Sequence, residues 1–272
     1  MQFALVDGKR VEAFIKGRGI CPLCNSVMIA KCGQRHINHW AHHRDRNCDP
    51  WWENETKWHR EWKNKFPEEC REVSHTADDG EIHRADVKTH TGIVIEFQHS
   101  NMSDEERISR EEFYKNLVWV IDGRGFRKNF DFYHKLPDPK SAIAQDIVWK
   151  EAKRHKNGAN TGLFYRKSKV IDHNSNRIIE DYELHALCKI ENEIDLSYNG
   201  YHQYDWTHPR QTWLEAKCPV YIDFGDDYLV KLEMYDSSGL KCIRFVMKRK
   251  FIHDVTVETD ACAIATRFYP IK

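Results

Sequence analysis

Apolar side chains recur with the period of a helix in one early segment of the chain. Trp58, Trp62 and Phe66 are spaced four residues apart, so all three fall on one face of a helix. We predict a helix over residues 51–66 that ends before Pro67, because proline cannot continue a helix. A polar stripe with the same spacing runs beside the apolar one and consists of Glu55, His59 and Lys63.

The next segment contains β-type runs and one further helical pattern. Residues 83–89 and 93–98 are predicted to be the two arms of a β-hairpin, since β-branched residues flank a turn. Ser103 is predicted to cap a helix that reaches about residue 116, and residues 117–121 form another apolar run. A strand, a helix and a strand at this spacing make a crossover, so the two flanking strands are expected to be parallel neighbours. Residues 51–122 are thus predicted to have the order α-β-β-α-β.

The two ends of the chain are predicted to be mainly β-structure. Residues 3–11 contain two short β-like runs around Asp7-Gly8, a typical hairpin turn. Residues 142–156 are predicted to be a basic helix, and alternating strands dominate from about Arg177 onwards. The expected fold class is therefore α+β with an α/β-type core. We expect three parts: an N-terminal module over residues 1–50, a core over residues 51–136, and a mixed helical and then β-rich C-terminal region over residues 137–272.

The composition indicates the class of protein but says less about its binding partners. Hydrophobic residues make up 40% of the chain and charged residues 31%, as in a globular protein. No apolar run has the length of a membrane span, and the chain does not begin with the basic and then apolar pattern of a signal peptide. We therefore expect an intracellular, cytoplasmic protein without a membrane partner.

Basic residues are unevenly distributed, although the net charge is zero. Residues 1–66 contain twelve Lys and Arg against seven Asp and Glu, and residues 146–170 contain seven against two. Such basic surfaces suit a phosphate backbone. Ordinary solvated surfaces have the same composition, so charge alone leaves nucleic-acid binding open.

Cysteine and histidine cluster near the start of the chain. Four of the nine cysteines lie within the first fifty residues, which without an export signal favours a metal site over disulfides. Cys21-Pro-Leu-Cys24 is followed after fourteen residues by His39-Trp-Ala-His42. We predict that Cys21, Cys24, His39 and His42 bind Zn²⁺, with the two histidines on one face of a helix. Neighbouring residues that compete for a place in this site are Cys32, His36, His43 and Cys48.

The expected role of this zinc site is structural. A site with four protein ligands has no open position for chemistry. The alternative is a set of buried thiols and surface histidines that bind no metal. In either case the candidates for catalysis lie elsewhere in the chain.

Two carboxylates on the predicted hairpin are candidates for a catalytic metal site. Asp86 and Glu96 are equidistant from Thr91 at the turn, so in register they face each other across the ladder. Two opposed carboxylates repel, and one of them takes up a proton unless a cation such as Mg²⁺ or Mn²⁺ lies between them. Gln98 shares the face of Glu96 and is expected to orient the attacking water. An exposed, metal-free pair is the alternative, but the apolar run around Glu96 favours a buried carboxylate that needs a partner.

Further polar side chains are expected to converge on this hairpin. Glu55 and His59 lie beside the buried stripe of the preceding helix. Arg110 and Tyr114 are one turn apart on the following helix and are expected to grip a phosphate. Arg84 lies on the first arm of the hairpin. Taken singly, each of these residues also fits an ordinary surface position.

An ordered set of short motifs joins these candidates between about residues 15 and 122. The motifs are Cys21-x-x-Cys24, His39-Trp-Ala-His42, Glu55-Thr56-x-x-His59-x-x-x-Lys63, His83-Arg84-Ala85-Asp86-Val87, Glu96-Phe97-Gln98-x-Ser100, Arg110-x-x-x-Tyr114 and Val118-Trp119-Val120-Ile121. The set resembles the CoiA-like competence proteins, members of the PD-(D/E)XK nuclease superfamily. Each motif is weak on its own, but the ordered set is specific.

This resemblance implies a restriction-endonuclease-like mixed sheet flanked by helices. It also implies that Asp86 and Glu96 bind a divalent metal, together with the Phe97 carbonyl. Gln98 stands where the superfamily more often has lysine, which removes a positive charge near the scissile phosphate. Lys63, Arg84 or Arg110 are expected to compensate for it.

We therefore expect a deoxyribonuclease that hydrolyses phosphodiester bonds with Mg²⁺ or Mn²⁺, in DNA processing or defence. The catalytic candidates are Glu55, His59, Asp86, Glu96 and Gln98, and the candidates for DNA binding are Lys63, Arg84, Arg110 and Tyr114. The DNA is single- or double-stranded, and the basic zinc module helps to hold it. Two alternatives remain open. One is a catalytically inert, zinc-containing DNA-binding module, and the other is a subunit that contacts a protein partner or itself through residues 140–272.

Overall fold

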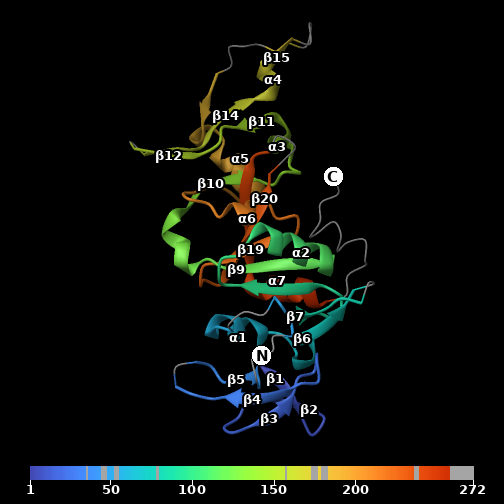
Figure 1. Cartoon of the computed structure of the whole chain (residues 1–272). Helices are drawn as coiled ribbons and strands as arrows, with labels where there is room; N and C mark the ends of the chain where they lie inside the picture. Colours follow the sequence, from blue (N-terminus) through green and yellow to red (C-terminus); the bar gives the residue numbers. More distant parts are fainter. Residues whose placement is uncertain are drawn as a thin grey trace. The chain divides into compact units, whose positions relative to one another are not determined.

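The structure of the chain is a computed structural model (Figure 1). It describes residues 1–272 except residues 35, 44–47, 52–54, 78–79, 157, 173–176, 179–182, 236–238 and 258–272. The chain divides into two compact units. The first unit comprises Met1–Asp122, Glu215–Val220 and the described part of Arg249–Lys272, and the second comprises Gly123–Leu214 and Tyr221–Lys248.

The first unit begins with a five-stranded antiparallel sheet. Its strands in spatial order are β2 (Lys9–Glu12), β1 (Phe3–Val6), β3 (Arg18–Ile20), β4 (Val27–Lys31) and β5 (His39–His42). β1 and β2 form the predicted hairpin, and the turn residues Asp7 and Gly8 have φ angles of 50° and 77°. Two positive φ angles in succession are typical of the tight turn that joins twisted strands.

Four further strands of the first unit form a mixed sheet. Their spatial order is β9 (Leu117–Asp122), β8 (Val94–Gln98), β7 (Ile82–Lys88) and β6 (Arg71–Thr76). β7 and β8 form the predicted hairpin, with Val87 opposite Ile95 and Lys88 opposite Val94. β8 and β9 are parallel, which confirms the predicted crossover. β6 is not expected from the sequence, because most of its residues are polar.

Helix α1 (Lys57–Lys63) is shorter than predicted and contains Trp58 and Trp62 of the predicted apolar stripe, whereas Phe66 follows the helix. Thr56 caps it, since its hydroxyl oxygen accepts the His59 N–H at 3.3 Å, and residues 52–54 of the predicted helix lie outside the described residues. The stripe packs against Phe97 of β8. The centroid of the Phe97 ring lies 6.1 Å from that of Trp58, 5.5 Å from that of Trp62 and 6.4 Å from that of Phe66. A short 3-10 helix, η1 (Glu68–Cys70), follows.

Two more helices cover the mixed sheet of the first unit. α2 (Asp104–Tyr114) begins at Ser103, whose hydroxyl oxygen accepts the Glu106 N–H at 3.1 Å as predicted. Nearly all of α7 (Lys248–Thr256) also belongs to this unit. Its Phe251 ring lies 6.2 Å from Trp62, and its Val255 carbonyl accepts a hydrogen bond from Thr91 at 2.8 Å. A segment near the C-terminus thus completes the core that begins with α1.

The second unit contains a larger group of antiparallel strands and several short elements. Its main strands in spatial order are β10 (Phe130–Pro137), β18 (Tyr198–Trp206), β21 (Lys241–Met247), β20 (Tyr228–Met234) and β19 (Val220–Asp223). Its other strands are β11 (Ile147–Trp149), β12 (Lys153–His155), β13 (Gly158–Asn160), β14 (Leu163–Arg166), β15 (Ile171–Asp172), β16 (Arg177–Ile178) and β17 (His185–Ala186). Its helices are η2 (Arg124–Asn129), α3 (Ala142–Asp146), α4 (Lys167–Val170), η3 (Leu187–Lys189), α5 (Glu191–Ser197) and α6 (Gln211–Leu214).

The predicted helix over residues 142–156 is wrong beyond its first turn. α3 ends at Asp146, and β11 and β12 follow. Ile147 and Val148 are β-branched, which favours a strand. Trp149 is buried in the core of the second unit, where its ring lies 5.5 Å from Phe164.

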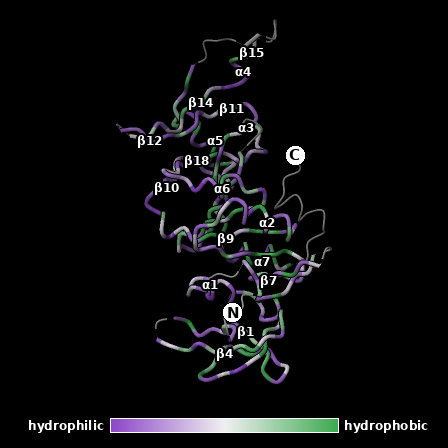
Figure 2. The backbone as a smooth tube through the Cα atoms, in the orientation of Figure 1, coloured by the Kyte–Doolittle hydropathy of each residue, from purple (hydrophilic) through white to green (hydrophobic). Residues whose placement is uncertain are grey.

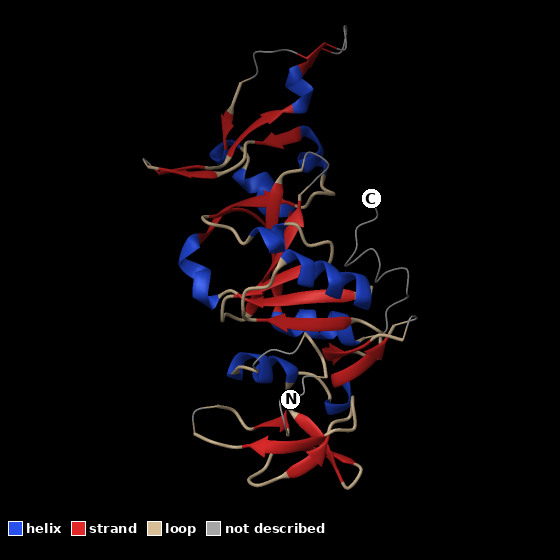
Figure 3. Cartoon of the chain, in the orientation of Figure 1, coloured by secondary structure: helices blue, strands red, loops and turns tan. Residues whose placement is uncertain are grey.

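The architecture is mixed α+β, as expected, with few helices (Figure 3). Four Cys and His side chains, of Cys21, Cys24, His42 and Cys48, gather in the N-terminal part of the chain. In Figure 2 the tube at β9 has mainly the colours of hydrophobic residues, and all six residues of this strand are buried. Among the described helices, none has both the length and the apolar character needed to cross a membrane.

Candidate functional site

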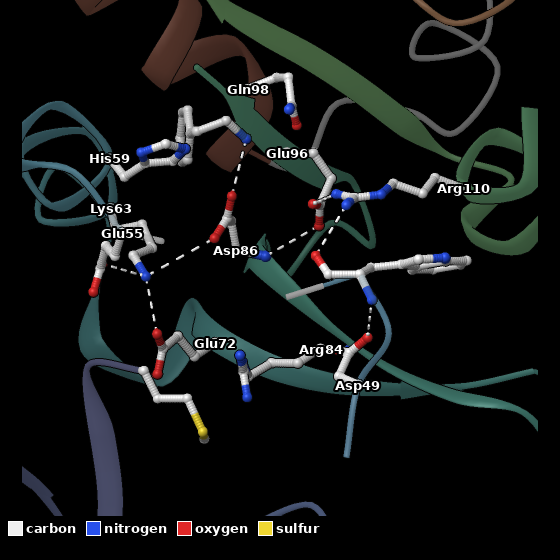
Figure 4. Close-up of a pocket in the computed structure, with 13 residues that line it drawn as sticks. Asp49, Glu55, His59, Lys63, Glu72, Arg84, Asp86, Glu96, Gln98 and Arg110 are labelled. Atoms are coloured by element: carbon white, nitrogen blue, oxygen red, sulfur yellow. Dashed lines mark hydrogen bonds and ion pairs between the residues drawn. The ribbon is translucent and has the colours of Figure 1, made fainter. Parts of the chain in front are cut away.

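A pocket in the first unit gathers most of the predicted polar residues (Figure 4). Its volume is about 60 Å³, which admits a few water molecules or a hydrated ion. Five carboxylates and three permanently cationic side chains line it. Of the nine residues predicted for catalysis or DNA binding, eight contribute to the lining: Glu55, His59, Lys63, Arg84, Asp86, Glu96, Gln98 and Arg110.

The carboxylates of Asp86 and Glu96 replace ladder hydrogen bonds at the end of the hairpin. The Asp86 N–H donates to Glu96 Oε1 at 3.2 Å. In return the Phe97 N–H donates to Asp86 Oδ2 at 3.0 Å. Each carboxylate is therefore held by the backbone of the opposite strand, and its second oxygen faces other partners in the pocket.

Glu96 is buried, and its second oxygen is paired with a cation. Arg110 Nη1 donates to Glu96 Oε2 at 3.1 Å. Burial and the nearby charge of Asp86 raise the pKa of Glu96 to about 8, although Arg110 opposes this shift. Repulsion between two opposed carboxylates has this effect when no cation lies between them.

Lys63 supplies a positive charge on the Asp86 side of the pocket. Its Nζ lies 3.9 Å from Asp86 Oδ1, 2.6 Å from Glu55 Oε1 and 2.9 Å from Glu72 Oε1. Burial lowers the pKa of Lys63, but the charges of Glu72 and Glu55 outweigh it and raise the pKa above its ordinary value. Lys63 thus stays charged and ties α1 to β6 and β7.

Arg84 differs from Lys63 in its contacts. It lines the same pocket from β7. Within the described part of the chain its guanidinium makes no hydrogen bond or ion pair, whereas its backbone N–H donates to Asp49 Oδ2 at 3.0 Å. Five N–H donors without protein partners can receive an anion.

Gln98 and His59 are held by neighbouring groups at the edge of the pocket. The Gln98 amide donates to the Ser100 hydroxyl at 3.1 Å and to the Ser100 carbonyl at 3.3 Å. His59 Nδ1 lies 2.8 Å from the Thr56 hydroxyl and accepts the Thr56 N–H at 3.3 Å. Both side chains are buried and so have fixed orientations.

The structure assigns other contacts to the two residues predicted to grip a phosphate. Arg110 binds Glu96, Glu106 and the Trp51 carbonyl, so its guanidinium orients a carboxylate. Tyr114 does not line the pocket. Its hydroxyl is buried without a hydrogen-bond partner among the described residues, because the ring packs against Trp51 and its aromatic neighbours.

Cys21, Cys24, His42 and Cys48 form a second cluster, whose ligand atoms all lie within 4.8 Å of one another. We refer to these four residues as the Cys/His cluster. Cys21 Sγ lies 3.7 Å from Cys48 Sγ, and Cys24 Sγ lies 3.4 Å from His42 Nε2. Tetrahedral Zn²⁺ places two sulfurs about 3.8 Å apart and a sulfur and a nitrogen about 3.5 Å apart, given its bond lengths. The four side chains therefore fit this ion.

His39, predicted as the fourth ligand, is not a member of this cluster. The His39–His42 segment is strand β5 and not a helix, so residues three apart point to opposite faces. His39 Nδ1 instead lies 2.9 Å from the Ile37 carbonyl. Cys48, which the sequence leaves as a competitor, takes its place.

Two acidic residues of the pocket are not identified by the sequence patterns. Glu72 lies on β6, a strand that the sequence does not predict, and it accepts the backbone N–H groups of Gln2 and Phe3 at 2.8 and 3.2 Å. Asp49 follows Cys48 directly and is 3% exposed. The one signal for Asp49 is its position between a metal-ligand candidate and Pro50.

Residues 9–50 match the family model of competence protein CoiA, N-terminal domain. The matched segment contains all four members of the Cys/His cluster and the first two of the ordered motifs, so the match supports the CoiA-like resemblance for this N-terminal part of the chain. No curated protein and no solved structure matches the chain.

Proposed function

We propose that this CoiA-like protein is a PD-(D/E)XK-type nuclease. It hydrolyses phosphodiester bonds of DNA with Mg²⁺ or Mn²⁺ held by Asp86 and Glu96. The order of α1, β7, β8, α2 and β9 supports this proposal, since it positions both carboxylates at one end of a hairpin. The observation that carries it is the excess of carboxylates over cations around this pair.

The donor set of the pocket suits a hard divalent cation. When all five are ionised, five carboxylates against three cations leave two negative charges, which one divalent ion offsets. In the described residues, only the Cys/His cluster brings three or more His, Cys, Asp or Glu ligands together. Among the residues that the structure describes, the pocket thus has no group of three such ligands, and Asp86 and Glu96 supply two carboxylates. This number suits Mg²⁺, which commonly binds one or two carboxylates and keeps several waters. When bound, the ion supplies a water of lowered pKa and neutralises charge on the phosphate.

Neighbouring side chains account for the other requirements of phosphodiester hydrolysis. Arg84 binds the substrate phosphate with its guanidinium, which makes no hydrogen bond or ion pair with the residues that the structure describes. Lys63 provides the charge that Gln98 lacks, because it lies 3.9 Å from Asp86. Gln98, fixed by Ser100, orients the attacking water. His59 lines the same pocket and holds a proton of that water.

The Cys/His cluster is proposed to bind structural Zn²⁺. Its four ligands leave no open position, so the ion stabilises the N-terminal module. The basic surface of this module contributes to DNA binding.

Circular DNA tests the proposal directly. We expect the protein to cut circular single- or double-stranded DNA with Mg²⁺ or Mn²⁺ and not with EDTA. D86A and E96A should each lower the rate at least about 100-fold, as expected when an ion loses one of two carboxylates. E112A, which removes an exposed carboxylate of α2, is the matched control and should cut normally. Wild-type cleavage by D86A or E96A excludes the catalytic assignment, and DNA binding without any cleavage favours the inert DNA-binding alternative.

A further inference from the structure

Residues 48–51 lead from the Cys/His cluster directly into the pocket. We call them the bridging segment. It starts at the cluster ligand Cys48, and both Asp49 and Trp51 line the pocket. Neither residue has a role in the proposed hydrolysis, so their contacts require a separate explanation.

Asp49 holds the strand that carries Asp86. Its Oδ1 accepts the Trp51 N–H at 3.0 Å and lies 2.9 Å from His83 Nδ1. Its Oδ2 accepts the Arg84 N–H at 3.0 Å. All three contacts are buried or partly buried. The carboxylate thus fixes β7 two residues before Asp86.

Trp51 holds the partner of Glu96. Its indole stacks on His83 with ring centroids 3.3 Å apart and planes inclined by 12°. Its carbonyl accepts a hydrogen bond from Arg110 Nη2 at 2.9 Å, while Arg110 Nη1 donates to Glu96 Oε2 at 3.1 Å. The same guanidinium therefore joins the bridging segment to Glu96 (Figure 4).

We propose that Asp49 and Trp51 are positioning residues that couple the Cys/His cluster to the Asp86–Glu96 pair. An ion in the cluster fixes Cys48, and the next three residues then hold one carboxylate through β7 and the other through Arg110. Loss of a cluster ligand lowers the affinity of the pocket for its divalent cation. This coupling is reciprocal, as for any two linked sites. The inference rests on the proposed function, because it assigns a cation to Asp86 and Glu96.

Mn²⁺ affinity of the full chain, measured by titration calorimetry, tests the coupling. D49N keeps the size of the side chain but removes one acceptor, so we expect Mn²⁺ binding to weaken about 10-fold, as for other residues that orient metal ligands. Zinc content should stay unchanged, and excess Mn²⁺ should restore the cleavage rate. E81Q is the matched control, since Glu81 contacts His83 Nε2 at 2.8 Å and is exposed. Its Mn²⁺ affinity should equal that of the wild type.

A cluster variant tests the other end of the bridging segment. C48S should lose zinc and weaken Mn²⁺ binding by a similar factor. If C48S does not fold, removal of zinc from the wild type with a thiol-reactive reagent provides the same comparison. Unchanged Mn²⁺ affinity in D49N, or after loss of zinc, overturns the inference. Absence of Mn²⁺ binding that depends on Asp86 and Glu96 in the wild type instead overturns the proposed function.

Discussion

Glu96 shows at the scale of one side chain how the pocket depends on a cation. The residue is 5% exposed, lies beside Asp86 and forms an ion pair with Arg110. Its pKa of about 8 means that at neutral pH the carboxyl holds its proton for much of the time. A bound divalent ion favours the ionised form, so binding near pH 7 should release protons.

The first prediction concerns the stability of E96Q without metal. The pKa of Glu96 in the folded chain, about 8, lies above its ordinary value of 4.5. The folded state therefore binds more protons than the unfolded state between these values, and stability falls as pH rises through this window. The E96Q substitution should remove this loss, because a glutamine side chain does not titrate.

Thermal unfolding in EDTA at pH 5 and pH 8 measures the effect. We expect E96Q to match the wild type at pH 5 and to exceed it at pH 8 by at least about 1 kcal/mol, or about 2–4 °C. Mg²⁺ should stabilise the wild type alone. An E96Q variant that loses stability with pH as the wild type does contradicts the prediction.

The second prediction concerns Lys63, which is buried among three carboxylates. K63M leaves Glu55 and Glu72 without this cation, and breaking a buried ion pair costs about 3–5 kcal/mol. Chemical denaturation measures the loss. K57M on the same helix is the matched control, because the Lys57–Glu61 pair is exposed and such pairs contribute about 0.3–0.5 kcal/mol. Equal losses in the two variants would exclude the proposed role of Lys63.

At the scale of elements, the sequence predicts those parts of the fold whose pattern is local. The β7–β8 hairpin, α2 and β9 follow from apolar periods and caps within a few residues. The pocket residues on the hairpin follow from symmetry about Thr91, and the observed pairs Val87 with Ile95 and Lys88 with Val94 have that symmetry. Local signals of this kind need no knowledge of distant segments.

Elements decided by distant contacts are not predicted. H-x-x-H spacing fits a helix as well as a strand, and pairing of β5 with β4 determines the strand. Glu72 enters the pocket because polar β6 pairs with β7. Asp49 acts through Arg84 and His83, more than thirty residues away in sequence. The capping box at Thr56 is a local signal for the start of α1. The predicted helix nevertheless starts at residue 51, because the apolar pattern of residues 51–66 begins before Thr56.

The third prediction distinguishes the two candidates for the fourth zinc ligand. C48A should lose most of its zinc, because Cys48 Sγ lies 3.7 Å from Cys21 Sγ. H39A should keep about one equivalent, since His39 lies outside the cluster. Metal analysis of the purified variants measures both. Zinc loss in H39A with retention in C48A would restore the ligand set expected from the sequence.

At the scale of the whole chain, the first unit is discontinuous. Residues before Asp122 form most of it, and Glu215–Val220 and α7 complete it. The Trp119 N–H donates to the Pro219 carbonyl at 2.9 Å, and Phe251 packs against Trp62. The second unit occupies the sequence between these parts.

The fourth prediction follows from this connectivity. A chain truncated after residue 138 loses Pro219, Phe251 and the Val255 carbonyl, and therefore should not fold cooperatively, although it keeps every residue of the pocket. Differential scanning calorimetry and Mn²⁺ titration should show no transition and no binding. A truncated chain that retains both would contradict it. F251A in the full chain, which creates one cavity at a cost of about 3–5 kcal/mol, provides a graded comparison.

α7 is synthesised long after the other helices of the first unit, and this order has a consequence for folding on the ribosome. About 130 residues separate Asp122 from Val255, which at about 5–20 residues per second amounts to roughly 7–25 seconds of translation. During that interval the apolar stripe of α1 lacks Phe251, and the turn at Thr91 lacks its partner. A nascent chain therefore carries all the pocket residues in the order needed for cleavage but cannot assemble them. Only a chain synthesised past α7 acquires the proposed capacity to cut DNA.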